Sequence, residues 1–357
     1  MRRLTATQTR QARAAAQGLA GRATTVAGAV RKVVALQAQD VRANRLAVRV
    51  RTTGLTAADV DAACRHREVV RTWAMRGTLH MLAADDFGWV TGLLGPYFAA
   101  RGAPRRRQLG LDEATLERAT TALDTIATTP LTRAGIVERL AGHGTVLDPR
   151  SQAPAHLLAY AALTGQLCRG PDTAKDEPTY VLVREWLGAQ RALAEDEALA
   201  RLAERYLAGH GPATAADLAA WSGLPVGRAK RGLAAIHTEP VEAAGEAAVV
   251  LAGHAGDPPA PSRLLGHFDA YLLGYRGRAL AVPQAHAHVI QAGGGFVMPA
   301  VLVAGQVVGT WRLRSTMDPM RVELEPFGES RIPDTRNEMA DLGRFLRRQV
   351  VAGKPMG

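Results

Sequence analysis

The middle of the chain carries the same pattern of elements twice, and this repeat constrains the fold more than any other feature of the sequence. The first copy runs through "LDEATLERATTALDTIAT", "PLTRAGIVERLAGHG" and "SQAPAHLLAYAALTGQLCRG" and ends on the apolar "PTYVLV". The second runs through "EDEALARLAERYLAGHG", "PATAADLAAWSG" and "LPVGRAKRGLAAIHTEPV" and ends on "AAVVLAG". Each copy reads as three helices followed by two short strands, which is typical of the winged helix-turn-helix module.

Local signals support this reading. Thr132 and Thr214 follow proline-containing turns, where a hydroxyl can cap the short second helix of each copy. A looser copy lies near the N-terminus. It comprises a helix over about 25–35, the segment "LQAQD", a helix over about 41–51, a helix capped by Thr56 over "TAADVDAACRHR", and the wing hairpin "VVRTWAMRGTLHML".

The C-terminal part has a different character. After the linker "GDPPAPS", the runs in "FVMPAVLVAGQVVGTWRLR" and "RVELEPF" predict a small sheet over about 263–327, and "TRNEMADLGRFLRRQVV" predicts a helix across it. The sequence therefore predicts an α+β fold of three tandem winged helix-turn-helix modules followed by a small β-rich C-terminal domain. The expected domains are 1–108, 109–192, 193–257 and 258–357. We expect "PRRRQLG" at 104–110 to be a basic linker in solvent.

Charge and cysteine content narrow the class of partner. The 357 residues carry a formal net charge of +11 and a sequence pI of about 10.4, which favours a polyanion, nucleic acid ahead of an acidic membrane surface. The excess of arginine over lysine also fits a coding bias, which weakens this signal. Cys64 and Cys168 form no disulfide framework or zinc motif, and no signal peptide or membrane-spanning run is present. We therefore expect a cytoplasmic protein without a membrane partner.

The segment "ALQAQD" at 35–40 is the strongest candidate for chemistry. Asp40 is a good N-cap for a helix beginning at Val41, so the residues before it should be extended, with Gln37 and Gln39 on one face and the apolar residues between them in the core. Paired carboxamides do not titrate near neutral pH, but they can position a water and face a developing positive charge. Such chemistry suits a substrate that is already activated, for example a purine alkylated at N7. The spacing alone also leaves open a structural role in bonding to neighbouring backbone.

The motif segments resemble a known family. "LQAQDVRANRLAVRVR" and "VVRTWAMRGTLHMLAADD" are similar to the signature of the AlkZ/YcaQ family of tandem winged-helix DNA glycosylases, and "LLGHFDAYLLGYRGR" and "VAGQVVGTWRL" are similar to its C-terminal blocks. The likeness covers essentially the whole chain. The Gln, apolar, Gln triplet corresponds to Gln37, Ala38 and Gln39; YcaQ-like members carry Asp as the third residue, so this chain falls on the AlkZ side.

The resemblance implies an activity. It implies a monofunctional glycosylase, active in DNA repair and antibiotic self-resistance, that hydrolyses the N-glycosidic bond of N7-alkylated purines and unhooks interstrand crosslinks of the azinomycin type. It also implies catalysis by Gln37 and Gln39, no metal or other cofactor, and a concave basic cleft for double-stranded DNA with alkylated or crosslinked purines. We further expect a monomer associated with the nucleoid.

Other polar residues are candidates for DNA contact. Arg76, Thr78 and His80 in "RGTLH" are expected to bind phosphate, although a purely structural role in the wing turn is equally open. Weaker candidates for phosphate binding are Arg71, Arg276, Arg278, Arg312 and Arg314.

For three further candidates, a structural role competes with a functional one. Lys32 could attack the sugar as a Schiff-base lyase, but a surface role is favoured. Asp40 could act as a general base, but capping is favoured. His286 and His288 have the strand spacing that could bind a metal, but no third ligand is nearby and a structural role is favoured. The glycine-rich "QAGGGF" is expected to be a flexible hairpin tip that probes the minor groove.

Two other functions compete with the glycosylase. The alternative is a non-catalytic winged-helix transcriptional regulator, and a protein-interaction scaffold is a weaker one. A regulator predicts tight binding to one operator sequence, whereas a glycosylase predicts binding that depends on the lesion, with little sequence preference.

Overall fold

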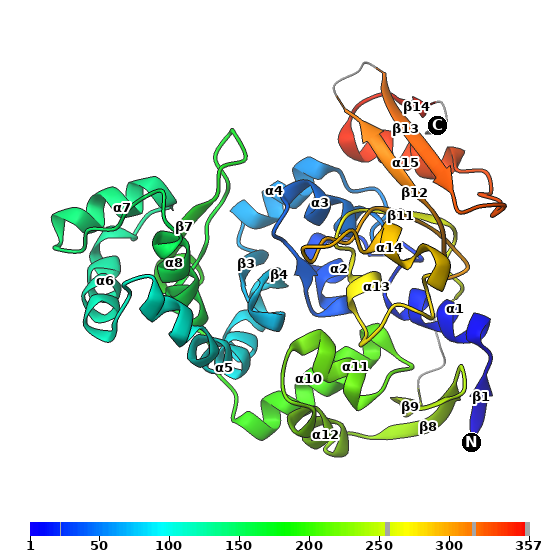
Figure 1. Ribbon diagram of the computed structural model, residues 1–357, viewed down its shortest axis with the longest axis horizontal. Coiled ribbons are helices and arrows are strands. Elements are labelled where there is room, and N and C mark those ends of the chain that lie inside the picture. Colours follow the sequence, from blue (N-terminus) through cyan, green and yellow to red (C-terminus); the bar gives the residue numbers. More distant parts are fainter. Residues whose placement is uncertain (22, 254–257, 316–318, 354–357) are drawn as a thin grey trace.

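The first winged-helix module holds the motif segment and has the predicted order of elements. The computed structural model describes residues 1–21, 23–253, 258–315 and 319–353 (Figure 1). The Asp40 carboxylate caps the second helix by accepting from the Ala43 amide at 2.7 Å, and Val34 ends the first helix with a positive φ of 67°. The elements of this module are α2 (Val26–Val33), β2 (Leu36–Gln37), α3 (Val41–Arg49), α4 (Ala57–Arg65), β3 (Val69–Trp73) and β4 (Leu79–Ala83).

The second module repeats three helices and a hairpin, as predicted. Thr132 caps its second helix by accepting from the Gly135 amide at 3.2 Å. A short strand, β5 (Leu131–Thr132), leads into that helix. The other elements of this module are α6 (Glu113–Ile126), α7 (Arg133–Gly142), α8 (Ala153–Leu163), β6 (Leu167–Arg169), β7 (Thr179–Leu182) and α9 (Val183–Trp186).

The third module follows the same order. Thr214 and Asp217 form a reciprocal capping box at the start of its second helix, and Gly223 ends that helix in the left-handed region (φ 80°). The elements are α10 (Glu195–His210), α11 (Ala215–Ser222), α12 (Val226–Ala234), β8 (Thr238–Ala243) and β9 (Glu246–Leu251).

The modules are less separate than the sequence predicts. The wings of the first two modules join through the antiparallel pairing of Arg71 with Arg169, which makes one six-stranded sheet of order β2-β4-β3-β6-β7-β5. The N-terminal strand β1 (Arg2–Leu4) pairs in parallel with β8, so the start of the chain completes the sheet of the third module rather than the first. Helix α1 (Ala6–Ala16) packs against α10 of that module.

The expected basic linker at 104–110 is wrong over most of its length. Residues 104–108 form the last turn of α5 (Phe87–Gln108), a long helix that packs on α8 and α10. Gly95 permits the close approach of α5 to α8, because a Cβ at this position would lie 2.0 Å from the Leu163 carbonyl oxygen. Arg106 is buried and donates to the Ala99 carbonyl at 2.8 Å, so packing holds the helix together despite Pro104.

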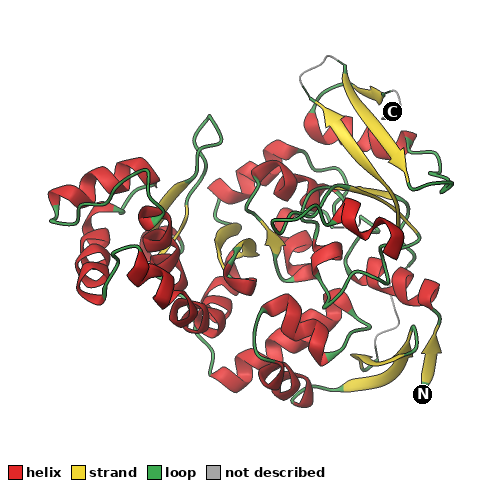
Figure 2. Ribbon diagram, in the orientation of Figure 1, coloured by secondary structure: helices red, strands yellow, loops and turns green. Residues whose placement is uncertain are grey.

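The C-terminal region contains the predicted sheet, with five strands in the order β10-β11-β12-β13-β14 (Figure 2). The final helix is shorter than predicted. Arg347 adopts a left-handed conformation (φ 52°) and the chain then returns as a parallel strand beside β13. The elements are β10 (Arg263–Leu265), α13 (Ala270–Leu273), α14 (Ala287–Ile290), β11 (Ala300–Val303), β12 (Gln306–Arg314), β13 (Met320–Pro326), α15 (Arg336–Leu346) and β14 (Val350–Ala352). The first two residues of the expected linker, 256 and 257, lie outside the described residues.

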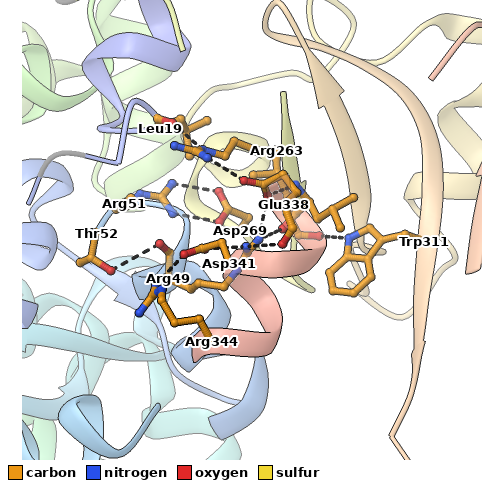
Figure 3. Close-up of polar contacts among 12 residues, drawn as sticks. Leu19, Arg49, Arg51, Thr52, Arg263, Asp269, Trp311, Glu338, Asp341 and Arg344 are labelled. Carbon is orange, nitrogen blue, oxygen red and sulfur yellow. Dashed lines mark hydrogen bonds and ion pairs between the residues drawn. The ribbon is translucent and has the colours of Figure 1, made fainter. Parts of the chain in front are cut away.

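Two features fix the first module against the rest of the protein. The largest apolar core is shared between its wing and the third module, where Val70 and Leu82 belong to the same cluster as Tyr206 and Trp221. A buried ionic network joins α3 to the C-terminal region (Figure 3). In it Arg49, fully buried, pairs with Glu338 at 3.0 Å and with Asp341 at 2.9 Å on α15.

A second buried pair lies beside the first. Arg51 and Asp269, both fully buried, form two hydrogen bonds of 2.9 Å each. Two charges in such a place are costly to separate, because removing one leaves the other unpaired in a medium of low polarity. Within the described residues, no helix is both long and apolar enough to cross a membrane.

Candidate functional site

The two glutamines of the motif lie on one face, as predicted. Leu36 and Ala38 are buried at 0% and 2% exposure, whereas Gln37 is half-buried and Gln39 is exposed. Gln37 Nε2 donates to Gln39 Oε1 at 2.7 Å, so the two carboxamides are in direct contact. The extended backbone that orients them is held by β4, which pairs with Leu36 and Gln37 and accepts from the Ala38 amide.

Arg76 determines which way the amides point. Its Nη2 donates to Gln37 Oε1 at 3.2 Å, and its Nη1 donates to the Trp221 carbonyl at 2.6 Å. A guanidinium only donates, so the atom of Gln37 that faces it is the oxygen. The Gln37 nitrogen must then face Gln39 and meet its oxygen. The chain of donors therefore runs from Arg76 to Gln37 to Gln39 and leaves one lone pair on each amide oxygen for another partner.

The backbone at Arg76 is strained. Arg76 has φ 57° and Gly77 has φ 68°, in the left-handed region that disfavours residues with a Cβ. The surrounding structure holds Arg76 there nonetheless. Burial, and then the nearby charge of Arg278, lower the pKa of Arg76 to about 10. It remains a cation at neutral pH, with no carboxylate in ion-pair range among the described residues.

Asn44 and His80 are buried neighbours of Gln37. Asn44, buried on α3, donates to the Gln37 carbonyl oxygen at 3.2 Å. His80 is the cross-strand neighbour of Gln37 on β4, and its exposure is only 2%. Burial, and then the charge of Arg76, lower the pKa of His80 to about 3. The neutral ring donates from Nδ1 to the Thr78 carbonyl at 2.9 Å, so His80 lies inside the wing rather than on a DNA-facing surface.

The other residues of the wing turn have local partners. The Thr78 hydroxyl donates to the Met75 carbonyl at 3.1 Å and helps to close the turn. Thr78 is half-buried, so phosphate contact at this position remains a prediction.

Arg278 approaches the site from the C-terminal region, and Arg276 lies two residues before it. The positive charge of Arg278 helps to lower the pKa of Arg76, so the two side chains lie near each other. Arg278 also donates to the Leu272 carbonyl and, at 3.2 Å, to Gln291 Oε1. Gln291 begins the glycine-rich segment, so Arg278 links that segment to the neighbourhood of the motif. Arg276 is exposed on the same loop, and its backbone amide donates to Asp217.

The remaining arginine candidates lie elsewhere. Arg71 is buried, pairs with Asp172 at 2.6 Å and joins β3 to the hairpin of the second module, so its charge is already neutralised inside the protein. Arg312 and Arg314 are exposed on β12 in the C-terminal sheet, and Arg314 pairs with Glu323 at 3.0 Å.

The structure also places the residues considered for a lyase, a general base or a metal site. Asp40 caps α3, and the side chain of Lys32 runs alongside Gly18, where a Cβ would lie 3.2 Å from its Cγ. The strand expected for His286 and His288 is wrong, because these residues belong to a short 3₁₀-helix and to α14. His286 stacks on Phe327 with ring centroids 4.2 Å apart. Within the described ranges, no group of three His, Cys, Asp or Glu residues is arranged to hold a metal.

The glycine-rich segment is a closed loop rather than a hairpin tip. It connects α14 to β11, and the Met298 amide donates to the Ile290 carbonyl at its base. Gly293, Gly294 and Gly295 all have positive φ, and Phe296 is 55% exposed. The reason is local: α14 precedes the segment where a strand was expected, so no partner strand exists to make a hairpin.

The sequence did not reveal the contacts that orient the motif. The bond from Arg76 to Gln37 spans 39 residues and the bond to the Trp221 carbonyl spans 145, and neither leaves a mark in local sequence. Asn44 leaves a weak signal, because Val41, Ala47 and Val48 lie three or four residues from it and make that face of the helix otherwise apolar.

Known proteins share this arrangement of the chain. A family model described as "DNA glycosylase AlkZ-like" matches residues 30–345. An interstrand DNA cross-link repair glycosylase of Streptomyces sahachiroi is 29% identical over 319 residues, which cover 80% of this chain and 81% of that protein. The solved structure of the Streptomyces sahachiroi DNA glycosylase AlkZ matches with a TM-score of 0.81 and 25% identity, covering 99% of this chain and 100% of that one.

These matches decide between the function classes left open by the sequence. The family match extends from α2 to α15 and includes the motif, all three modules and most of the C-terminal region. It therefore favours an enzyme over a winged-helix regulator or scaffold. The chain belongs to the AlkZ-like family of DNA glycosylases.

Proposed function

We propose that this monofunctional DNA glycosylase hydrolyses the N-glycosidic bond of N7-alkylated purines in double-stranded DNA, including purines joined in interstrand crosslinks. Gln37 and Gln39 are the proposed catalytic residues. The observation that carries this proposal is the contact between their two carboxamides, which lie on one face of the extended segment and are oriented by the half-buried Arg76. The relative named as an interstrand DNA cross-link repair glycosylase supports crosslinked purines as substrates.

The chemistry needs little from the protein. Alkylation at N7 gives the purine a positive charge, so the bond between C1′ and N9 breaks with its electron pair moving to the departing base. The sugar becomes oxocarbenium-like, and a water forms the new C1′–O bond and loses one proton to solvent. The products are the free alkylated purine and an abasic site. The two amide oxygens provide what this route requires, a fixed acceptor for the water and a negative dipole facing the sugar.

The position of the motif also suits a crosslinked substrate. A purine tied to both strands cannot leave the duplex in the way that most glycosylases require. Gln39 is exposed, and Gln37 is half-buried beside it, so the pair is presented at the surface rather than at the bottom of an enclosed chamber. We propose that the lesion meets the pair while it remains in the duplex.

Positive charge near the pair supports DNA binding from the same side. We propose Arg76, Arg276 and Arg278 as the basic residues nearest the lesion, with Thr78 beside them and Arg312 as a more distant phosphate contact. Arg71, Arg314 and His80 are left out because the first two are paired with carboxylates and His80 is buried. We also propose that the protein acts as a monomer on nucleoid DNA in the cytoplasm.

The test is release of an alkylated base. A duplex with one N7-methylguanine is incubated with excess enzyme, and alkali then cleaves the abasic product. We expect release by the wild type, and a loss of roughly 100- to 1,000-fold in Gln37→Ala and Gln39→Ala, the size seen when one charge-stabilising group is removed. Gln349→Ala, which changes an exposed glutamine near the C-terminus, is the matched control. Wild-type rates in both motif variants would overturn the proposed mechanism.

A further inference from the structure

A pocket of about 420 Å³ lies beside the wing turn of the first module. Its walls come from the turn between β3 and β4, from α5 and α8, and from the end of α11. Aromatic rings contribute much of the lining, from Trp73, Phe98 and Tyr160. The volume falls in the range of roughly 300–1,000 Å³ that is usual for small-ligand sites.

The pocket is lined by basic residues and by no acidic ones. Arg76, Arg101, Arg106 and His156 line it, and no acidic residue is among its lining residues. Elsewhere in the described chain many arginines pair with carboxylates, but Arg76, Arg101 and Arg106 form no such ion pair within the described residues. Arg101 donates to the hydroxyl of Tyr97 at 3.1 Å and lies over the ring of the same residue. An occupant that carries negative charge would therefore meet uncompensated cations.

Arg106 is the most deeply buried of the three arginines that line the pocket. It is only 7% exposed, its guanidinium lies 4.4 Å from the centre of the Tyr160 ring, and one nitrogen donates to the Ala99 carbonyl. Its Nε is buried without a hydrogen-bond partner. Burial is the main cause that lowers the pKa of this guanidinium. The contacts with Ala99 and Tyr160 therefore hold the Arg106 guanidinium in place as a fixed part of the pocket wall.

We propose that this pocket holds one unpaired nucleotide of the bound DNA strand next to the lesion. The base stacks on the aromatic wall and its phosphate meets Arg101 at the exposed edge, which are the two features that recognise single-stranded nucleotides without regard to sequence. Arg76 connects this pocket to catalysis, because the same side chain lines the pocket and donates to Gln37. The inference rests on the proposed function, since it takes damaged DNA as the ligand.

The test measures binding without chemistry. Two labelled duplexes, identical except that one has a single unpaired adenine, compete for the protein in a fluorescence anisotropy titration. We expect the wild type to prefer the duplex with the unpaired adenine by about fivefold or more, the lower end of what one stacked base contributes. Ala159→Phe, which places a ring in the pocket, should abolish that preference while binding to the fully paired duplex persists.

Matched variants separate the pocket from general effects. Ala141→Phe adds the same ring at an exposed position on α7, and Arg107→Ala removes one charge from an exposed position on α5; both should keep the preference. Arg101→Ala and Tyr160→Leu should reduce it. A wild type without the preference, or an Ala159→Phe protein that keeps it, would overturn the inference. If the preference follows the pocket but no alkylated base is released, the proposed function fails and the nucleotide pocket stands.

Discussion

Replacing Arg76 by lysine distinguishes an orienting role from a phosphate-binding role. Lysine keeps the positive charge, and an ammonium binds phosphate well as a point charge. It has a single nitrogen, however, and cannot donate to Gln37 Oε1 and to the Trp221 carbonyl with the spacing of the two guanidinium nitrogens. If Arg76 orients the amides, Arg76→Lys is therefore a damaging change, although it conserves charge.

The size of the effect follows from the bond that is lost. A hydrogen bond to a charged group contributes roughly 1.5–3 kcal/mol, and the 3.2 Å bond to Gln37 is at the long end of the range, so we take about 1.5 kcal/mol. Once that bond is gone, the Gln37 amide can turn over and present nitrogen where oxygen is needed. A loss of about 1.5 kcal/mol in transition-state stabilisation lowers the rate roughly tenfold. This loss is smaller than that expected for Gln37→Ala, which removes the amide altogether.

Single-turnover kinetics measure the two roles separately. With excess enzyme, the orienting role predicts that Arg76→Lys lowers the rate of base release about tenfold and leaves the dissociation constant for lesion DNA and its salt dependence nearly unchanged. Arg107→Lys, at an exposed position on α5, is the control and should behave as wild type. A wild-type rate in Arg76→Lys, together with weak DNA binding in Arg76→Ala, would refute the orienting role and assign Arg76 to phosphate.

Three further predictions concern stability and the cap. His80 and His210 are buried with pKa values lowered from 6.5 to about 3, so between these limits the unfolded chain binds more protons than the native protein and stability falls as pH drops below 6.5. Each histidine contributes up to about 1.4 kcal/mol per pH unit to the slope of the unfolding free energy against pH. Urea unfolding at pH values from 7 to 5 measures that slope, and His210→Phe should make it shallower. Asp40→Ala should cost about 1 kcal/mol of stability through the lost cap, whereas Asp40→Asn keeps a good cap and should keep both stability and base release; loss of activity in a stable Asp40→Asn protein would give Asp40 a catalytic role. Asp269→Ala should lower the free energy of unfolding by about 3–5 kcal/mol, because Arg51 is left charged and fully buried, and an unchanged urea midpoint would contradict that.

The orientation of the glutamine pair could be predicted because every signal for it lies within a few residues. Asp40 ends the extended segment by starting a helix, and alternation then places Gln37 and Gln39 together. The three-helix repeats were predictable for a similar reason, since Thr132 and Thr214 mark helix starts by local chemistry. These predictions needed no knowledge of the rest of the chain.

The errors occurred where distant packing overrides local preference. Pro104 and three successive arginines indicated a solvated linker, yet α5 continues through them because it packs against α8, where the buried Arg106 lies over the Tyr160 ring. The N-terminal strand was missed because three residues, two of them arginine, carry no alternation that marks a strand. It forms through parallel pairing with β8, more than 230 residues away. Figure 1 shows this pairing at the edge of the molecule, where β1 runs beside β8.

The chemistry of the pair explains why so much of the chain holds it in place. A carboxamide has no charge that surroundings can tune, so its contribution depends on orientation alone. Three parts of the protein supply that orientation: the wing turn through Arg76, the third module through the Trp221 carbonyl, and β4 through backbone pairing. The helix that Asp40 caps is fixed at its other end by the buried Arg49 and its partners on α15 (Figure 3). A change that loosens α15 should therefore slow base release from a distance, even though no residue of that helix bonds to Gln37 or Gln39 in the described structure.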